Sequence, residues 1–217
     1  MTIYPTSESG EKTLLQVPGL PYGVELPLVK LPGTRNGRRL RIASLNLVGQ
    51  IRLNHDLGHL LAERIRAEIG DLDGVAVLTV VEKALQLTQV AAGELGLDAV
   101  AVAYNRVKPH MEADSRPLVQ VGSESVTSGG KLLALYERDI HILAQATRGI
   151  ILIDDVVSSG GTILGLLDLV EAAVNSVGRP APELLGIFCA AQEGKPRVRL
   201  PAPVHALASL PTPEELG

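Results

Sequence analysis

Two adjacent aspartates, Asp154 and Asp155, follow an apolar run and stand shortly before the small-residue segment Ser158–Thr162. That segment holds two glycines and three hydroxyl side chains, and a helical pattern follows it at once. Unpaired N–H groups at a helix N-terminus favour a phosphate, and glycine lets the backbone approach it closely. The carboxylates would repel a phosphate but suit the vicinal hydroxyls of a sugar, or a hydrated Mg²⁺. The order of these residues therefore predicts a site for a ribose 5-phosphate.

A plainer interpretation treats Ser158–Thr162 as an ordinary strand-to-helix turn, with Thr162 as the helix cap and both aspartates in solvent. Short glycine motifs on their own often have this meaning. The two acids directly after an entirely apolar strand favour the binding site, because such a strand delivers its end to the ligand-binding edge of an open α/β sheet.

The remainder of the chain supplies such a sheet. Four apolar runs have the length of buried strands: Val75–Val81, Ala99–Tyr104, Gly149–Ile153 and Leu184–Ala190. Between them, apolar residues recur at helical spacing over Asn54–Ile69, Ala84–Leu95 and Ile163–Val177. Strands that are apolar on both faces and alternate with helices are typical of a parallel sheet covered on both sides. We therefore expect an α/β fold, and either Asn54 or Asp56 could cap the first helix.

Other segments form the surroundings of this sheet. Residues 1–20 are expected to be a loosely ordered lead-in. Two strand-like stretches, Gly23–Leu31 and Leu40–Val48, predict a hairpin or two short strands. Residues 106–136 are expected to form a loop followed by a second hairpin, and a proline-rich tail ends the chain. We find no repeat or linker, so residues 1–217 are expected to form one domain.

Composition excludes several function classes. The formal net charge of −4 gives no support for a nucleic-acid surface. No apolar run approaches the length of a membrane span, and the N-terminus lacks a secretion signal. The single cysteine, Cys189, cannot form an intrachain disulfide and fits a reducing compartment. We expect a cytoplasmic protein without a nucleic-acid or membrane partner.

The string from Ile150 to Thr162 resembles the signature with which type I phosphoribosyltransferases bind 5-phosphoribosyl 1-diphosphate (PRPP). The resemblance implies that Asp154 and Asp155 hold the ribose hydroxyls and contribute to a Mg²⁺ site. It also implies a PRPP site made of both acids and the residues after them: Asp154, Asp155, Val156, Val157, Ser158, Ser159, Gly160, Gly161 and Thr162.

Two further segments are similar to this family. The loop after Val75–Val80 would hold the diphosphate through Glu82, Lys83 and Ala84, although Ala84 stands where a glycine is common in relatives. The end of the next strand would add Arg106 and Lys108, and a mobile flap would follow. Family members also carry a small hood built from N- or C-terminal segments, here Tyr22–Val48 or Phe188–Lys195, which binds the base.

The activity implied is transfer of a phosphoribosyl group from PRPP to a nitrogenous base, with Mg²⁺ as cofactor and Asp154, Asp155 and Lys83 as catalytic residues. Chain length and element order are most similar to the adenine and xanthine branch, so we expect a purine acceptor and a homodimer. The alternative is a regulator of the same fold that senses PRPP or a nucleotide without turnover. The absence of a helix-turn-helix pattern from the sequence favours the enzyme.

Two remaining features are given structural interpretations. His55 and His59 have the spacing of a zinc-protease helix, but the acid between them is an aspartate and no third ligand is evident. We expect both histidines on a helix surface. Cys189 lies within an apolar run and is expected in the core.

Overall fold

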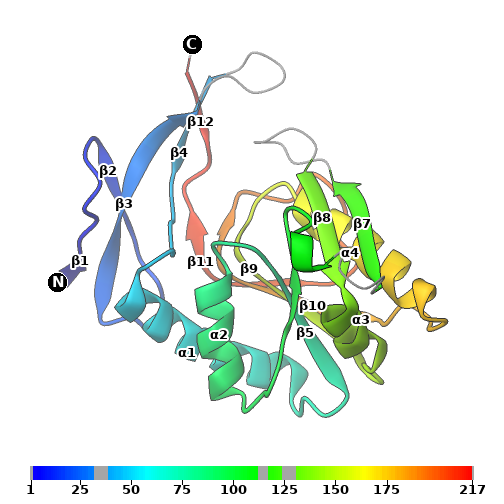
Figure 1. The fold of residues 1–217 in the computed structure, drawn as a ribbon. Helices are drawn as coiled ribbons and strands as arrows, with labels where there is room; N and C mark the ends of the chain where they lie inside the picture. Colours follow the sequence, from blue (N-terminus) through cyan, green and yellow to red (C-terminus); the bar gives the residue numbers. More distant parts are fainter. Residues whose placement is uncertain (1, 32–38, 112–116, 124–130, 217) are drawn as a thin grey trace.

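The computed structural model describes residues 2–31, 39–111, 117–123 and 131–216. Its centre is a five-stranded sheet in the order β11-β10-β9-β5-β6, in which every neighbouring pair is parallel (Figure 1). The strands are β5 (Val75–Val80), β6 (Ala101–Ala103), β9 (Gly149–Val157), β10 (Leu184–Glu193) and β11 (Val204–Leu210). The expected α/β fold with a parallel sheet is confirmed.

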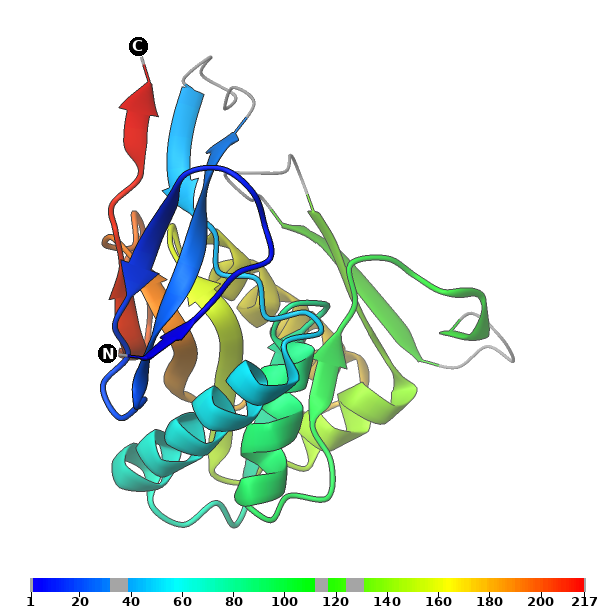
Figure 2. The same cartoon turned by 90° about the vertical axis from the view of Figure 1, so that its left-hand side faces the viewer.

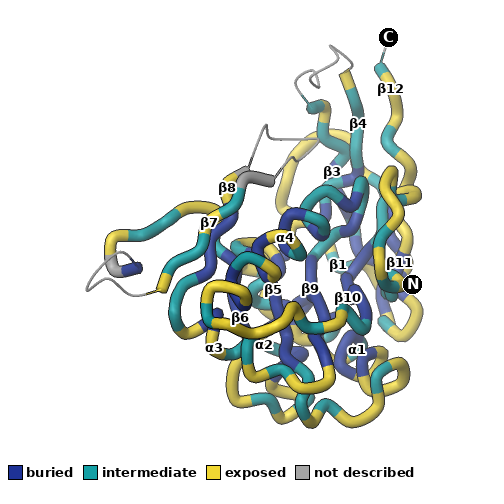
Figure 3. Tube along the Cα trace, turned by 90° about the vertical axis from the view of Figure 1, so that its right-hand side faces the viewer, coloured by how far each residue is buried: buried dark blue, intermediate teal, exposed yellow. Residues whose placement is uncertain are grey.

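Helices cover both faces of this sheet. The helices are α1 (Ile51–Ile69) and α2 (Leu85–Glu94) on one face, and α3 (Glu137–Ala144) and α4 (Gly161–Ser176) on the other. Successive residues of the central strand point to opposite faces. Ile151 and Ile153 pack with α1 and α2, whereas Ile150 and Leu152 pack with α3 and α4. The middle of the sheet is therefore buried on both sides, as Figure 3 shows.

A second sheet stands apart from the first and forms the hood (Figure 2). Its strands are β1 (Thr2–Tyr4), β2 (Lys12–Leu15), β3 (Tyr22–Leu31), β4 (Arg39–Ala43) and β12 (Glu214–Leu216). The long β3 pairs with β1, β2 and β4, and β12 pairs with β4. The N-terminal segments and the C-terminal strand β12 thus build one hood, and Tyr22–Val48 contributes to it as expected. The other expected contributor, Phe188–Lys195, does not, because Phe188–Glu193 belong to β10 of the central sheet.

The expectation of a loosely ordered lead-in over residues 1–20 is wrong. Besides β1 and β2, this segment contributes Leu15 and Val17, each only 4% exposed. Both belong to the same apolar cluster as Ile151 and Phe188 of the central sheet. The segment is ordered because its apolar side chains complete a core that the central sheet alone leaves open.

Several elements differ from those the sequence predicted. Helix α1 begins at Ile51, so neither Asn54 nor Asp56 caps it. The Asn54 amide instead donates to the carbonyl oxygens of Leu47 (2.6 Å) and Gln50 (2.9 Å). Strand β9 continues through Val157, beyond the expected end at Ile153. The proline-rich tail, for which no strand was predicted, contains β11 and β12.

The expected second hairpin is present as β7 (Leu118–Ser123) paired antiparallel with β8 (Lys131–Tyr136). A 3₁₀ turn, η1 (Pro109–Met111), precedes it. The remaining parts of the expected flap and hairpin, residues 112–116 and 124–130, lie outside the described residues. Among the described residues, no helix is long and apolar enough to span a membrane.

Candidate functional site

The two aspartates are the sixth and seventh residues of the nine-residue strand β9. Pairing with β5 ends at Ile153, opposite Thr79, whereas pairing with β10 continues through Asp154, opposite Cys189. Asp154 is 7% exposed, and its Oδ1 accepts the backbone N–H of Asp155 at 2.9 Å. Asp155 is half-buried. The acids therefore begin where the strand loses its β5 neighbour, at the carboxyl edge of the sheet.

The turn after β9 presents backbone N–H groups at the start of α4. Gly160 occupies the N-cap position with φ 86°, in the left-handed region that favours glycine. The N–H of Leu164 donates to the Gly160 carbonyl at 3.1 Å, and that of Gly161 to Ser159 Oγ at 3.4 Å. The N–H groups of Thr162 and Ile163 lie in the first turn, where a helix offers no acceptor. This arrangement can receive an anion.

A segment that sequence reasoning missed supports the turn from outside. The backbone N–H of Arg197 donates to the Ser159 carbonyl at 3.1 Å. A Cβ atom added at Gly160 would lie 2.9 Å from Val198 Cγ2 and 3.1 Å from Leu200 Cδ2. The connection between β10 and β11 therefore fixes the turn by close packing. No local pattern signals this contact, since the two segments are far apart in sequence.

The loop between β5 and α2 carries the predicted diphosphate residues. Glu82 and Lys83 are exposed, whereas Ala84 is 1% exposed at the N-cap position of α2. The peptide between Val81 and Glu82 is cis. The N–H of Val81 donates to the Ala103 carbonyl at 2.9 Å, which holds the loop beside the end of β6. Ala84 can thus offer a ligand only its backbone, and Lys83 offers a solvent-facing cation.

The end of β6 leads to the other predicted cations. Arg106 is exposed, and Lys108 is half-buried with its Nζ 5.0 Å from the centroid of the Tyr104 ring. Strands β9, β5 and β6 are consecutive neighbours in a parallel sheet. Their carboxyl ends therefore share one edge, and this edge brings together the acid pair, the Lys83 loop and the Arg106–Lys108 segment. Open α/β sheets bind ligands at this edge.

The donor set suits Mg²⁺ only in combination with a ligand. Within the described ranges, no group of three or more His, Cys, Asp or Glu side chains could hold a metal. Magnesium in phosphate sites commonly uses one or two carboxylates together with substrate oxygens and water. Asp154 and Asp155 fit that requirement, with Asp154 already accepting one backbone N–H.

The other candidate groups have structural roles. Cys189 is fully buried, and burial followed by the charge of Asp154 raises the pKa of its thiol to about 12. It is therefore a core residue and not a nucleophile at neutral pH. The side chains of His55 and His59 are 68% and 50% exposed, and His59 lies 3.6 Å from a Glu63 oxygen. Both surface assignments are confirmed.

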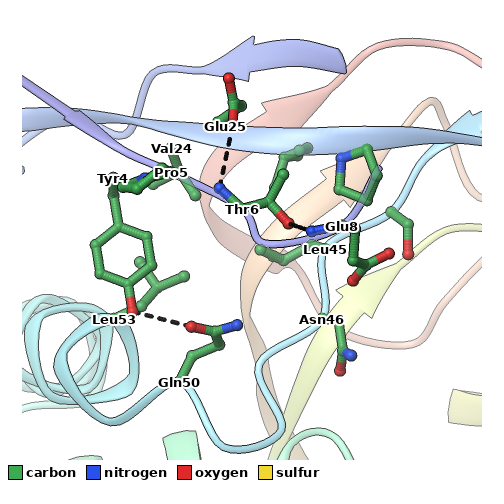
Figure 4. A pocket seen from close by; sticks show the side chains of 13 residues that line it. Tyr4, Pro5, Thr6, Glu8, Val24, Glu25, Leu45, Asn46, Gln50 and Leu53 are labelled. Carbon is green, nitrogen blue, oxygen red and sulfur yellow. Dashed lines mark hydrogen bonds between the residues drawn. The ribbon is translucent and has the colours of Figure 1, made fainter. Parts of the chain in front are cut away.

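A small cavity that is open to solvent lies between the hood and the start of α1 (Figure 4). The Tyr4 hydroxyl donates to Gln50 Oε1 at 2.9 Å beside it, and Glu25 accepts the backbone N–H of Thr6 at 3.2 Å. Its lining does not include the residues of the candidate site. Within the expected base-binding hood, the cavity touches β3 and the segment after β4.

No family model and no curated protein sequence matches this chain. Its fold, however, is that of the type I phosphoribosyltransferases. The adenine phosphoribosyltransferase of Giardia lamblia, solved with 9-deazaadenine, matches with a TM-score of 0.55 at 17% identity, over 77% of this chain and 87% of that one. The Saccharomyces cerevisiae enzyme, solved with an imino-altritol bisphosphate and adenine, matches with a TM-score of 0.53 at 16% identity, over 74% and 82%. At these identities the likeness establishes the fold.

Proposed function

We propose that this protein transfers the 5-phosphoribosyl group of PRPP to a purine base and releases diphosphate, in a Mg²⁺-dependent reaction. One observation carries the proposal. An acid pair on the central strand continues directly into a glycine turn at a helix N-terminus, in a fold shared with adenine phosphoribosyltransferases. A pentose that bears both a diol and a phosphate matches the two halves of that motif.

The turn would bind the 5-phosphate. The N–H groups of Thr162 and Ile163, with the hydroxyls of Ser158, Ser159 and Thr162, supply donors to its oxygens. Val156 and Val157 would contribute through the backbone that carries the acids to the turn. This phosphate is remote from the bond that breaks, so its binding energy can hold the sugar in position during the reaction.

The acids would act on the sugar. Asp154 and Asp155 accept hydrogen bonds from the ribose hydroxyls and place negative charge near a ring that becomes positive in the transition state. In the reaction, the bond from C1 of the ribose to the diphosphate oxygen breaks, and its electron pair leaves with the diphosphate. A base nitrogen forms the new bond to C1, and the proton that it carried passes to water or to the departing diphosphate.

The exposed cations would bind the leaving group. Lys83 follows β5, and Arg106 and Lys108 follow β6, at the edge of the sheet that also carries the acids. Glu82 and Ala84 would contribute through the loop that carries Lys83. Mg²⁺, held by Asp154, Asp155 and diphosphate oxygens, would supply further neutralisation of the leaving group's charge. Charge stabilisation of this kind requires the groups to be in place before the reaction.

Two further parts of the proposal concern the domain organisation and the acceptor base. We propose that residues 1–217 act as a single domain, because hood and central sheet share one apolar cluster. We favour a purine because the two similar structures were solved with adenine or 9-deazaadenine. The expected homodimer remains a prediction.

The proposal is tested by diphosphate release. The protein is incubated with PRPP and Mg²⁺ against adenine, hypoxanthine, guanine, xanthine, orotate and uracil. Release with one or more purines, and not with the pyrimidines, is the expected result. Tight PRPP binding without release for any base would favour the non-catalytic regulator, and absence of PRPP binding would overturn both.

A paired variant tests the site itself. Asp154→Asn combined with Asp155→Asn should abolish turnover or weaken PRPP binding by at least about tenfold, since two charged acceptors are lost. Asp168→Asn changes an exposed acid on α4 and is the matched control. Kinetics of the double variant equal to those of the control would remove the acid pair from the site.

A further inference from the structure

Lys108 is held at both its backbone and its side chain. Its carbonyl oxygen accepts the N–H of Met111 at 2.9 Å, and its own N–H lies 3.4 Å from Met111 Sδ. Met111 is fully buried, so it anchors the short turn that follows Lys108. At the other end of the side chain, the ammonium group lies 5.0 Å from the centroid of the Tyr104 ring. A lysine at the surface usually lacks this double restraint.

Tyr104 is itself fixed. Its backbone N–H and carbonyl pair with Ala134 of β8, each at 2.8 Å. Its ring lies edge-on to that of Tyr136, with centroids 5.9 Å apart at 62°. Burial, followed by the charge of Asp139, raises the pKa of the Tyr104 hydroxyl. The Tyr104 ring, which faces Lys108, is therefore held in place between the end of β6 and the β7–β8 hairpin.

Arg138, a neighbouring cation, also lies near an aromatic ring, but its charge is paired with that of a carboxylate. The Arg138 guanidinium lies 5.9 Å from the centroid of Tyr136 and also forms an ion pair with the buried Asp139 at 2.6 Å. Arg138 is thus neutralised within the protein. In the described part of the chain, Lys108 forms no ion pair with a carboxylate. An aromatic face attracts a cation through its quadrupole without cancelling the cation's charge.

We propose that Tyr104 is a positioning residue whose ring holds the Lys108 ammonium group ready for the diphosphate of PRPP. The inference rests on the proposed function and goes beyond it, because Tyr104 itself would not touch the substrate. A ring restricts the lysine side chain in advance, so less conformational entropy is lost when the anion binds. A carboxylate in the same place would restrict it equally but would compete with the diphosphate for the positive charge.

Binding of PRPP in the presence of Mg²⁺, measured by calorimetry, tests this inference. The variants are Tyr104→Leu, which removes the ring, Tyr104→Phe, which keeps it, Lys108→Ala, and the Tyr104→Leu/Lys108→Ala double variant. Tyr104→Leu should raise the Kd about two- to fivefold, the range expected for an exposed cation–π contact. Tyr104→Phe should leave it close to that of the wild type. In the Lys108→Ala background, loss of the ring should change the Kd no further.

Two results would overturn the inference while leaving the proposed function intact. One is a wild-type Kd in Tyr104→Leu. The other is an equal loss from Tyr104→Leu with and without Lys108, which would mean that the ring acts through general packing. The ring-current shift of the Lys108 ε-protons, measured by NMR, checks the contact directly and should vanish in Tyr104→Leu. A wild-type protein that binds no PRPP would instead refute the proposed function, and the inference with it.

Discussion

The hydroxyl of Thr88 donates a hydrogen bond to Thr79 Oγ1 at 3.1 Å, and Thr79 in turn donates to the Ile153 carbonyl at 2.9 Å. Both threonines are fully buried. The chain of bonds joins α2, β5 and β9 at the residue immediately before Asp154. It fixes the acid pair relative to the helix that begins after the Lys83 loop.

Thr79→Val should lower the free energy of unfolding by about 1–3 kcal/mol, because the substitution leaves the buried Thr88 hydroxyl without its acceptor. Urea unfolding at neutral pH provides the measurement. The Thr79→Val/Thr88→Val double variant should lose less than the sum of the two single variants, since both partners are then gone. Strict additivity would show that the two hydroxyls do not interact.

Gly160→Ala should destabilise the protein more than Gly178→Ala. Both glycines have positive φ, at 86° and 71°, and the strain of an alanine there is about 1–2 kcal/mol. A Cβ at Gly178 meets open space, whereas at Gly160 it meets Val198 and Leu200. Thermal unfolding of the two variants compares these costs. Equal losses of stability in the two variants would mean that the β10–β11 connection moves aside for the added Cβ at no cost in free energy.

Stability should fall at high pH through Cys189, whose pKa is raised to about 12 in the folded protein by burial and by Asp154. In the unfolded chain the thiol ionises near its ordinary pKa of about 8.5. The folded state therefore binds more protons between these values. The contribution of the protonated Cys189 thiol to the free energy of unfolding is complete below about pH 8.5. It is lost as the pH rises towards 12, at up to ~1.4 kcal/mol per pH unit. Urea unfolding between pH 8 and 10 should show a smaller decline for Cys189→Ala.

Tyr22→Phe should cost more stability than Tyr4→Phe, although the two rings stack with centroids 5.6 Å apart. The buried Tyr22 hydroxyl donates to the Asp56 carboxylate at 2.5 Å, and burial followed by this bond raises the Tyr22 pKa. Bonds to charged groups contribute about 1.5–3 kcal/mol, against about 0.5–1.5 kcal/mol for a neutral bond such as that of Tyr4 to Gln50. Paired denaturation curves would test the order, and the reverse order would contradict it.

The sequence predicted four of the five strands of the central sheet, and the order of the residues in the candidate site, for a local reason. The strands of a sheet buried on both faces are continuous apolar runs, and the acids and glycines that follow β9 stand next to one another in the chain. A site built from adjacent residues remains visible without knowledge of the fold. Lys83 and Lys108 were found only through the family resemblance, since an isolated lysine carries no local signal.

The sequence did not predict the parts whose stability comes from distant partners. Strands β1 and β2 lie in a polar, proline-containing segment and are ordered by pairing with β3. Helix α3 is short, and the acidic Asp139 interrupts its apolar pattern in the sequence. Asp139 is nevertheless fully buried, and its carboxylate accepts the Val102 N–H at 3.0 Å, a partner that lies far away in the sequence. The support that Val198 gives to Gly160 is likewise a tertiary contact without a sequence motif.

The apolar cluster that contains Leu15, Val17 and Phe188 has a mechanical consequence. The hood cannot move away from the central sheet as a rigid body without exposing this shared cluster to water. We therefore expect amides of β3 and β9 to exchange with deuterium in one cooperative opening event, and the two sheets to melt together.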